Sequence, residues 1–432
     1  MHQFYDMLME SQYWPREQLV DYQRSQLEQL LRHARANVPF YEHRLNPVFA
    51  RDGSIDWDKW GEIPIVKRAD LVDHRGAMQA RQLPPGHGGT NSTSSSGSTG
   101  LPITLTVSRL ATMVANVNRW RSHYWQSLDW SGVLCARRGD DPAVSSWPEG
   151  TYKGRWGPPW EPASAEGRAF EINRLAPSEQ LLAFLARTAT RYYATAPKPA
   201  QTLALDANRL GQSLRLEAIL AHGEAVGQAD RERCLSQFGA RVIDLYSSKE
   251  GLQMAHPCPS GIGLHVNAES ILLEILDDDG QPSALGQRGR VVITPFFSTA
   301  QPLIRYDQGD LATVGGNCRC GRSLPVLDSV DGRVTHMFRH PDGRTVAEKV
   351  PDRYRLLLGA SVWQIAQTGP HAFEVRYIAE QAHGDDAAKR VTRALHETYF
   401  PDAQVNYKRL RHIPLTSAGK FIEYINEWYS GG

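Results

Sequence analysis

The sequence predicts an α/β protein with a large N-terminal domain and a small α+β C-terminal domain. Strands and helices alternate between residues 107 and 246, which is the pattern of a sheet with connecting helices. From residue 269 onward, strands joined by Gly, Pro and Asp turns predominate, which indicates a β-rich subdomain. A turn-rich segment follows Gly332. We therefore expect one domain at residues 1–332 and a second at residues 333–432.

Composition excludes several classes of function. The chain has 432 residues, of which 41% are hydrophobic and 22% are charged, as in ordinary globular proteins. Lys plus Arg number 48 and Asp plus Glu number 47, so the charge balance favours neither a nucleic acid nor a membrane as a partner. No apolar run approaches the roughly 18–20 residues of a bilayer span, and the N-terminus lacks a signal-peptide pattern. Five cysteines are too few for a disulfide scaffold, which favours a cytoplasmic location.

Individual elements are predicted from periodicity and turn residues. Leucines at helical spacing predict a helix over residues 17–36, which Pro39 ends, and a short helix is expected near residues 70–72. Further along, the predicted helices span 107–127, 178–193 and 228–238. The predicted strands span 101–108, 132–136, a stretch before Gly223, 241–246, 270–277, 289–296 and 309–314. These elements are the scaffold on which the chemistry-bearing motifs are placed.

A polar run interrupts the pattern, because residues 90–100 contain only Thr, Asn, Ser and Gly. Such a run is either a flexible linker or a phosphate-binding loop, in which backbone N–H groups and hydroxyls donate to an anion. No Lys follows the last glycine of the run, which excludes a Walker A loop.

Five further motifs follow the polar run in order. They are HGEA at 222–225, DLYSSKE at 244–250, RYDQGDL at 305–311, Gly332-Arg333, and PLTSAGKF at 414–421. Together with SGSTGLP at 96–102, they resemble the successive nucleotide-binding motifs of adenylate-forming enzymes. The chain length and an N-terminal helix followed by VPFY are similar to the phenylacetate–CoA ligase branch and its CapK-like relatives.

This resemblance implies a site for ATP and AMP. It assigns Tyr246 to stack on adenine, Glu250 to hold Mg²⁺, and Asp310 to bind the ribose hydroxyls. It assigns catalysis to Lys420, together with Glu250. The other nucleotide-binding residues that it implies are Ser96, Gly97, Ser98, Thr99, Gly100, Gly223, Glu224, Ser247 and Arg333.

The resemblance also implies a reaction. A large adenylate-forming domain and a small mobile domain carrying Lys420 would activate a carboxylic acid, expected to be aryl or heteroaryl, with ATP. The products of that step are an acyl-adenylate and pyrophosphate, and CoA is the expected acceptor. An amine or a carrier-protein thiol is the alternative acceptor, and a non-catalytic nucleotide-binding relative is the alternative outside enzymes. Homodimers are common among such relatives.

Two positions depart from the usual motifs. Lys249 stands where Thr or Ser usually precedes the Mg²⁺-binding glutamate, and it is either a phosphate contact or a solvated substitution. Val334, Thr335 and His336 stand where one or two hinge aspartates usually follow Gly-Arg. The segment after them also differs from that of the CoA ligases. This difference weakens the expectation of CoA as acceptor more than the expectation of adenylation.

Three cysteines cluster near the motifs. Cys258 and His265 follow the Glu250 motif, and Cys318 and Cys320 follow Asp310. Three thiolates and one imidazole suit a closed tetrahedral Zn²⁺ site, to which we assign a structural role. Unrelated buried thiols are the alternative, and His256 is the competing imidazole.

A tryptophan-rich stretch lies where this family builds its acyl pocket. It contains Trp120, Trp125, Trp130, Trp147, Trp156 and Trp160. Aromatic walls would suit an aryl acid, whereas core packing is the plainer interpretation. Arg137 and Arg138 either face a polar group of the substrate or lie in solvent.

Overall fold

The computed structural model describes residues 1–94, 103–139, 145–261, 263–333, 338–342, 345–346, 350–351, 353–414 and 421–428. The chain divides into two compact units. The first contains residues 1–94, 104–308 and 312–330, and most of the second is residues 331–432, to which residues 309–311 also belong. Of the helices in the described parts, none is long and apolar enough to cross a bilayer.

Helices of the first unit are α1 (His2–Ser11), α2 (Arg16–Asn37), α3 (Arg68–Asp73), α4 (Arg109–Trp125), α5 (Ser178–Arg187), α6 (Pro197–Arg209) and α7 (Gln228–Phe238). The strands up to residue 333 are β1 (Thr90–Ser94), β2 (Thr104–Ser108), β3 (Val133–Arg137), β4 (Thr151–Gly154), β5 (Arg168–Ile172), β6 (Thr190–Thr195), β7 (Ala218–His222), β8 (Arg241–Ser248), β9 (Leu252–Pro257), β10 (Leu264–Val266), β11 (Ile271–Leu276), β12 (Arg288–Pro295), β13 (Tyr306–Val314) and β14 (Val326–Arg333).

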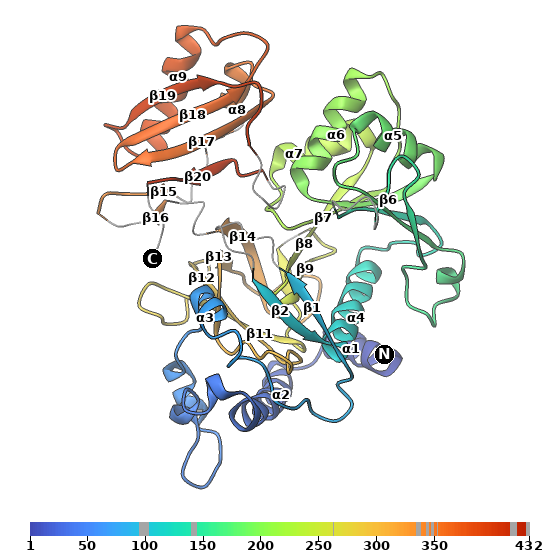
Figure 1. The fold of residues 1–432 in the computed structure, drawn as a ribbon, viewed down its shortest axis with the longest axis vertical. Coiled ribbons are helices and arrows are strands. Elements are labelled where there is room, and N and C mark those ends of the chain that lie inside the picture. The colour runs from blue at the N-terminus through green and yellow to red at the C-terminus, as the bar shows by residue number, and fades with distance from the viewer. Residues whose placement is uncertain are drawn as a thin grey trace. The chain divides into compact units, whose positions relative to one another are not determined.

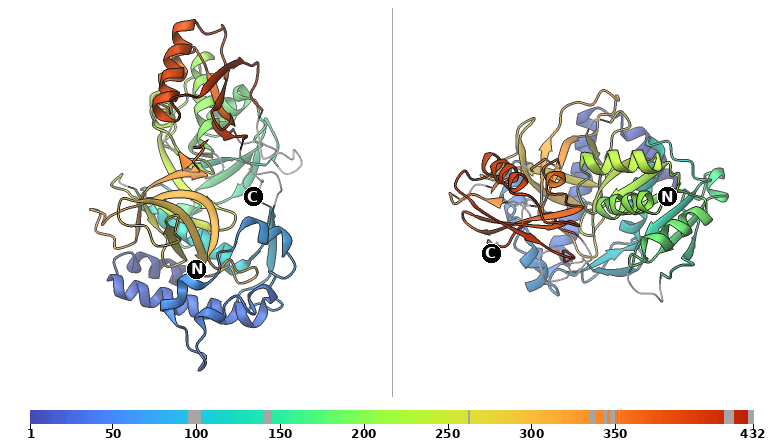
Figure 2. Two further views of the ribbon diagram at one scale, coloured as in Figure 1. Left: turned by 90° about the vertical axis from the view of Figure 1, so that its left-hand side faces the viewer. Right: turned by 90° about the horizontal axis from the view of Figure 1, so that it is seen from above.

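Twelve strands of the described chain form one sheet in the order β11-β12-β13-β14-β10-β9-β8-β7-β6-β3-β5-β4. Strands β5, β3, β6, β7 and β8 are mutually parallel. Each of α5, α6 and α7 connects one parallel strand to the next, and the three helices lie side by side on one face (Figures 1 and 2). This arrangement follows from the right-handed connection of parallel strands, since successive connections in one direction place their helices on the same face.

A hydrophobic cluster holds these helices to the sheet. It includes Leu181 and Phe184 of α5, Leu203 of α6, and Ile219 of β7, all essentially buried. Helix α7 ends at Gly239, whose left-handed φ of +68° an L side chain rarely adopts. The predicted helix over 228–238 is therefore confirmed to the residue.

Beyond β8 the sheet becomes antiparallel. Strand β9 runs antiparallel to β8 and β10, β10 to β14, and β11 to β12. Figure 1 shows strands β11, β12 and β13 of this portion near α3. The β-rich subdomain expected from residue 269 onward is confirmed.

One predicted helix is wrong in its second half. The helix expected over residues 178–193 stops at Arg187, and Thr190–Thr195 forms the buried strand β6. Ala189 adopts a φ of +51°, which breaks the helix, and four of the six residues that follow are β-branched or aromatic. Helices α1 and α6 were not predicted. Helix α6 begins with Pro197 at its first position, where proline is favoured because that position needs no N–H donor.

The second unit is a small α+β structure. Its elements are α8 (Arg353–Leu357), α9 (Asp385–Thr398), β15 (Phe338–Arg339), β16 (Thr345–Val346), β17 (Val362–Gly369), β18 (Ala372–Ile378), β19 (Gln404–Arg409) and β20 (Tyr424–Asn426). Strands β19-β18-β17-β20 form a sheet whose core includes Trp363, Phe373 and Leu395. Helix α9 connects β18 to β19, which pair in parallel. The α+β character expected of this region is confirmed.

Candidate functional site

Two motif segments meet at the carboxyl ends of parallel strands. Strands β7 and β8 pair in parallel with His222 opposite Leu245, so the turn Gly223-Glu224 lies beside the position of Tyr246. Gly223 adopts a φ of +82°, which lets the chain turn sharply after β7. Ligands of open α/β sheets bind at this edge, because the connecting turns leave a crevice there. Tyr246 and Ser247 are both half-buried at the end of β8.

Glu250 occupies the turn between β8 and β9. It is 5% exposed, and Arg68 at the start of α3 places its Nη1 4.0 Å from Glu250 Oε1. Ser248 Oγ accepts a hydrogen bond of 2.8 Å from the Gly251 N–H, which shapes the turn. A buried carboxylate of this kind is a hard oxygen donor, so Glu250 fits a Mg²⁺ ion. Lys249, in contrast, is exposed.

Arg68 was missed by sequence reasoning. Val66, two residues before it, pairs with Tyr306 as an isolated parallel bridge, and this contact brings the segment to the sheet. Arg305 reinforces the attachment by donating from Nη1 to the carbonyl oxygens of Gly61 and Ile63 at 2.6 and 2.9 Å. These contacts span more than two hundred residues of sequence, and no local pattern announces them.

Asp310 and Arg333 lie on neighbouring strands, β13 and β14. Arg333 Nε lies 3.3 Å from Asp310 Oδ1, and Asp310 is mostly buried. The Arg333 guanidinium pairs with one carboxylate oxygen of Asp310. The pair therefore offers a hydrogen-bond acceptor, the carboxylate, beside a donor, the guanidinium. Such a pair is suited to bind a vicinal diol.

Part of the predicted site lies outside the described residues. This applies to Ser96, Gly97, Ser98, Thr99 and Gly100, to the hinge positions 334–336, and to Lys420. The first five residues of the polar run form β1, which pairs with β2 as an antiparallel hairpin with Ser94 opposite Thr104.

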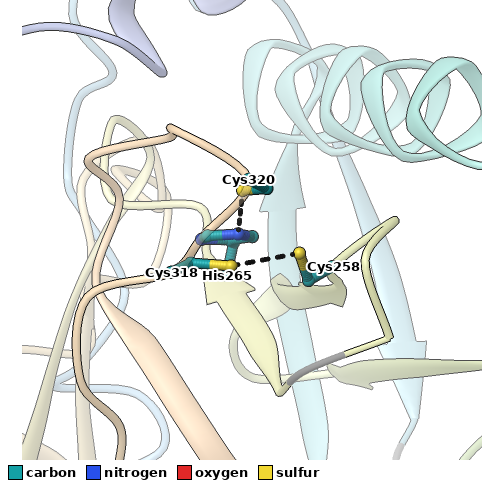
Figure 3. A group of neighbouring side chains, drawn as sticks. All are labelled: Cys258, His265, Cys318 and Cys320. Atoms are coloured by element: carbon teal, nitrogen blue, oxygen red, sulfur yellow. Dashed lines mark hydrogen bonds between the residues drawn. The ribbon is translucent and has the colours of Figure 1, made fainter.

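A separate cluster brings together Cys258, His265, Cys318 and Cys320 (Figure 3). Their ligand atoms all lie within 4.8 Å of one another. Cys258 Sγ is 3.3 Å from Cys318 Sγ, and His265 Nε2 is 3.2 Å from Cys320 Sγ. All five cysteines are free thiols, so the close pair is not a disulfide. A tetrahedral Zn²⁺ with bonds of about 2.3 Å would hold its sulfur ligands about 3.8 Å apart, and the set fits such an ion.

Neighbouring groups set the orientation and the protonation state of these side chains in a way that suits metal binding. His265 Nδ1 lies 3.4 Å from the Leu324 carbonyl oxygen, which leaves Nε2 for coordination. Burial lowers the pKa of His265 to about 4, so the imidazole is neutral at pH 7. Burial opposes ionisation of Cys318, but hydrogen bonds from the Cys320 N–H and neighbouring side chains lower its pKa to about 7. His256 lies outside the cluster and pairs with Gln253 Oε1 at 2.9 Å.

The tryptophans do not form one wall. Trp147 packs against the core cluster beneath α5, and Trp160 stacks on His2 with ring centroids 4.7 Å apart. Trp156 donates to the Gly132 carbonyl and Trp120 donates to the Trp156 carbonyl, both through indole N–H groups. Trp125 lies edge-on to His265. Packing therefore accounts for these five contacts without a substrate.

The two arginines after β3 differ. Arg137 is half-buried and donates from Nη2 to the Ala176 carbonyl oxygen at 3.3 Å. Arg138 is exposed. The backbone contact gives Arg137 a structural role in the described chain.

Several known proteins are similar to this chain in sequence or in fold. No protein-family model matches the chain. It is 25% identical over 339 residues to phenylacetate-coenzyme A ligase of Thermus thermophilus, covering 75% of this chain and 72% of that protein. Among solved structures, 2-hydroxyisobutyryl-CoA ligase with 2-HIB-AMP, in its postadenylation state, has a TM-score of 0.74 at 21% identity, covering 97% of this chain and 93% of its own. An amide bond synthetase from Marinactinospora thermotolerans has a TM-score of 0.53 at 14% identity, covering 76% and 67%. The expected fold class and the resemblance to the phenylacetate–CoA ligase branch are confirmed.

Proposed function

We propose that this chain, a sequence relative of phenylacetate–CoA ligase with the fold of the CoA ligases, is an AMP-forming acid–CoA ligase. It activates a carboxylic acid with ATP to give an acyl-adenylate and pyrophosphate, and then transfers the acyl group to CoA. The observation that carries the proposal is the parallel pairing of β7 and β8, because Glu224 follows the end of β7 while Tyr246 and Glu250 lie at and just after the end of β8. The aryl or heteroaryl nature of the acid stays a prediction.

The nucleotide is held by groups from several strands. The Tyr246 ring supplies a face on which adenine can stack, and the turn at Gly223-Glu224 lies beside it. Asp310, held by Arg333 at 3.3 Å, accepts from the ribose hydroxyls. The hydroxyls and N–H groups of Ser96, Ser98 and Thr99 are suited to donate to the departing phosphates. These contacts orient the α-phosphorus toward the acid.

Charge repulsion opposes this reaction, because the carboxylate of the acid and the α-phosphate of ATP are both anionic and must approach each other. Glu250 would hold Mg²⁺, which when bound offsets the negative charge of the polyphosphate. Arg68, 4.0 Å from Glu250, adds a positive charge beside the same carboxylate. Lys420 would stabilise the charge that develops in the transition state, and its place on the small C-terminal domain suits a residue that enters for one half-reaction.

We further propose that Cys258, His265, Cys318 and Cys320 hold a structural Zn²⁺. Four protein ligands close the coordination sphere, so the ion has no open position for substrate. The loop that carries Cys318 and Cys320 is joined to the end of α1, since Ser323 Oγ donates to Trp14 O at 2.6 Å. The ion would therefore stabilise a junction of distant segments.

CoA is the proposed acceptor, and an amine is the second candidate. The second candidate is favoured by the fold shared with an amide bond synthetase. A carrier-protein thiol, a homodimer and a cytoplasmic location stay predictions.

Carboxylate-dependent ATP–pyrophosphate exchange, run without CoA over a panel of acids, tests the proposal. We expect exchange with one class of acid, and its loss in Glu250→Gln. An Arg32→Ala variant, which breaks an exposed ion pair on α2, is the control. Exchange followed by thioester formation on adding CoA identifies the acceptor, and an amide formed with added amines identifies the alternative. ATP binding without exchange for any acid would contradict the function.

A further inference from the structure

A pocket lies at the edge of the parallel sheet opposite the proposed nucleotide site. The loop 155–167, which includes a short 3₁₀ helix at Pro162–Ala165, connects β4 to β5. Strand β4 is antiparallel to β5, and β5 is parallel to β3, so this loop lies at the amino ends of the parallel strands. The turns after β7 and β8 lie at the carboxyl ends. The pocket has a volume of about 290 Å³, and its walls include Arg155, Gly157, Trp160, Glu161, Pro162 and Ser164.

Packing contacts hold the walls of this pocket in place. A Cβ atom on Gly157 would collide with Ser164 Oγ, so the two sides of the loop meet at the closest distance that a glycine allows. The Trp160 ring stacks on His2 of α1, with ring centroids 4.7 Å apart and 16° between the planes. It also lies edge-on to Trp120 of α4 at 5.3 Å. The aromatic wall is therefore fixed by two helices before any ligand binds.

Three polar side chains of the pocket have no partner in the described part of the chain. Arg155 and Glu161 line the same pocket, yet they do not pair with each other, and neither side chain makes another hydrogen bond or ion pair there. Ser164 is 2% exposed, and its Oγ has no hydrogen-bond partner. A buried hydroxyl without a partner is unfavourable. The pocket therefore offers a cation, an anion and a hydroxyl beside an aromatic ring.

We propose that this pocket binds a free α-amino acid with an aromatic or other large apolar side chain. The Arg155 guanidinium donates to the carboxylate of the ligand, and its ammonium group donates to Glu161. The side chain of the ligand packs on Trp160 and Pro162. A volume of about 290 Å³ lies at the lower end of the roughly 300–1,000 Å³ of small-molecule sites, which suits a single amino acid. The site is separate from the proposed adenylation, which uses the opposite edge of the sheet.

Equilibrium dialysis of the full chain with radiolabelled L-phenylalanine, without ATP, tests the proposal. We expect saturable binding of one molecule per chain. The competitors are 3-phenylpropanoate, which lacks the ammonium group, 2-phenylethylamine, which lacks the carboxylate, and L-alanine, which lacks the ring. Each should bind more weakly than unlabelled phenylalanine by about tenfold or more, because each leaves one wall of the pocket without its partner. No binding of phenylalanine at millimolar concentration, or equal competition by any of the three, would overturn the proposal.

Two variants locate the amino acid in this pocket. Arg155→Met and Glu161→Gln each remove one charge from a side chain outside the core, and we expect either to raise the Kd for phenylalanine by about tenfold or more. The matched controls, Arg168→Met and Glu166→Gln, alter exposed charges of the same segment that do not line the pocket, and should leave the Kd unchanged. Melting temperatures verify that each variant folds.

Glu250→Gln separates this pocket from the proposed catalytic site, and it should keep phenylalanine binding. Loss of binding in Glu250→Gln with wild-type affinity in both pocket variants would place the amino acid at the catalytic site and overturn the proposal. Wild-type affinity in all three variants would overturn it as well. Neither result bears on the proposed ligase activity, which ATP–pyrophosphate exchange tests separately.

Discussion

Arg121 and Glu269 form a fully buried, two-point ion pair, with Nη1–Oε1 at 2.6 Å and Nη2–Oε2 at 3.1 Å. Arg121 also donates from Nη2 to Asn267 Oδ1 at 2.9 Å and from Nη1 to Leu8 O at 3.1 Å. Ser11 Oγ donates to Glu269 at 2.6 Å. The network joins α1, α4 and the turn before β11. It therefore anchors α4 against α1 and the sheet.

Breaking this pair should destabilise the first unit. Glu269→Gln leaves the Arg121 guanidinium buried without its counter-charge, and we expect a loss of about 3–5 kcal/mol in the free energy of unfolding. Urea denaturation measures it. Arg121→Met/Glu269→Leu removes both charges and should recover much of the loss. Arg32→Ala, in an exposed pair, should cost less than about 1 kcal/mol. A small effect of Glu269→Gln would mean that water reaches the pair.

His123 should make stability depend on pH. It is 2% exposed, and neither ring nitrogen has a hydrogen-bond partner among the described residues. Burial, with a contribution from the charge of Arg119, lowers its pKa to about 3. Below pH 6.5 the unfolded chain binds a proton at this residue that the folded chain does not, so stability falls as pH drops from 6.5 toward 3. The contribution is up to about 1.4 kcal/mol per pH unit.

His123→Phe removes this titration and keeps an aromatic ring beside Trp156. Urea denaturation at pH 7.5 and pH 5.5 should show a smaller difference in the variant than in the wild type. His43→Gln, at an exposed histidine, should leave the difference unchanged. An unaltered pH dependence in His123→Phe would show that His123 does not stay neutral when folded.

Loss of the metal should lower the thermal stability of the protein and leave its catalytic residues in place. We expect the purified protein to hold about one Zn²⁺ per chain, and Cys318→Ser to lose it and to melt at a lower temperature. Cys234→Ser, at a thiol of α7 that is buried in the core, should keep the metal. Elemental analysis and thermal denaturation measure both. A wild-type protein without zinc would refute the proposed centre.

Lys420 should contribute to the rate of adenylation more than to the binding of ATP. We expect Lys420→Ala to slow acid-dependent exchange by about 10²–10³-fold, because it removes a charge needed in the transition state. The Kd for ATP, measured by calorimetry, should change only slightly. Lys408→Ala on β19, at an exposed lysine, is the control. An equal loss of ATP binding and exchange would contradict the assigned role.

The sequence by itself determined those features that local patterns encode. The helix over 228–238 was predicted and ends at a glycine, and the order of six motifs resembled that of the adenylate-forming enzymes before any fold was known. The set of Cys258, His265, Cys318 and Cys320 was predicted from residue types and their position near the motifs, with His256 as the competing imidazole.

Tertiary structure decided the rest, because those contacts join residues far apart in the chain. It brought the predicted His265 to the three thiols and left His256 outside the cluster. It also ended a predicted helix at Arg187, where burial in a parallel sheet favours a strand rich in β-branched and aromatic residues. It also brought Arg68 to Glu250 and Arg121 to Glu269. Periodicity in the sequence predicts which face of an element is buried. Which distant residue lies against that face depends on how the sheet is assembled, and this cannot be predicted from the local sequence.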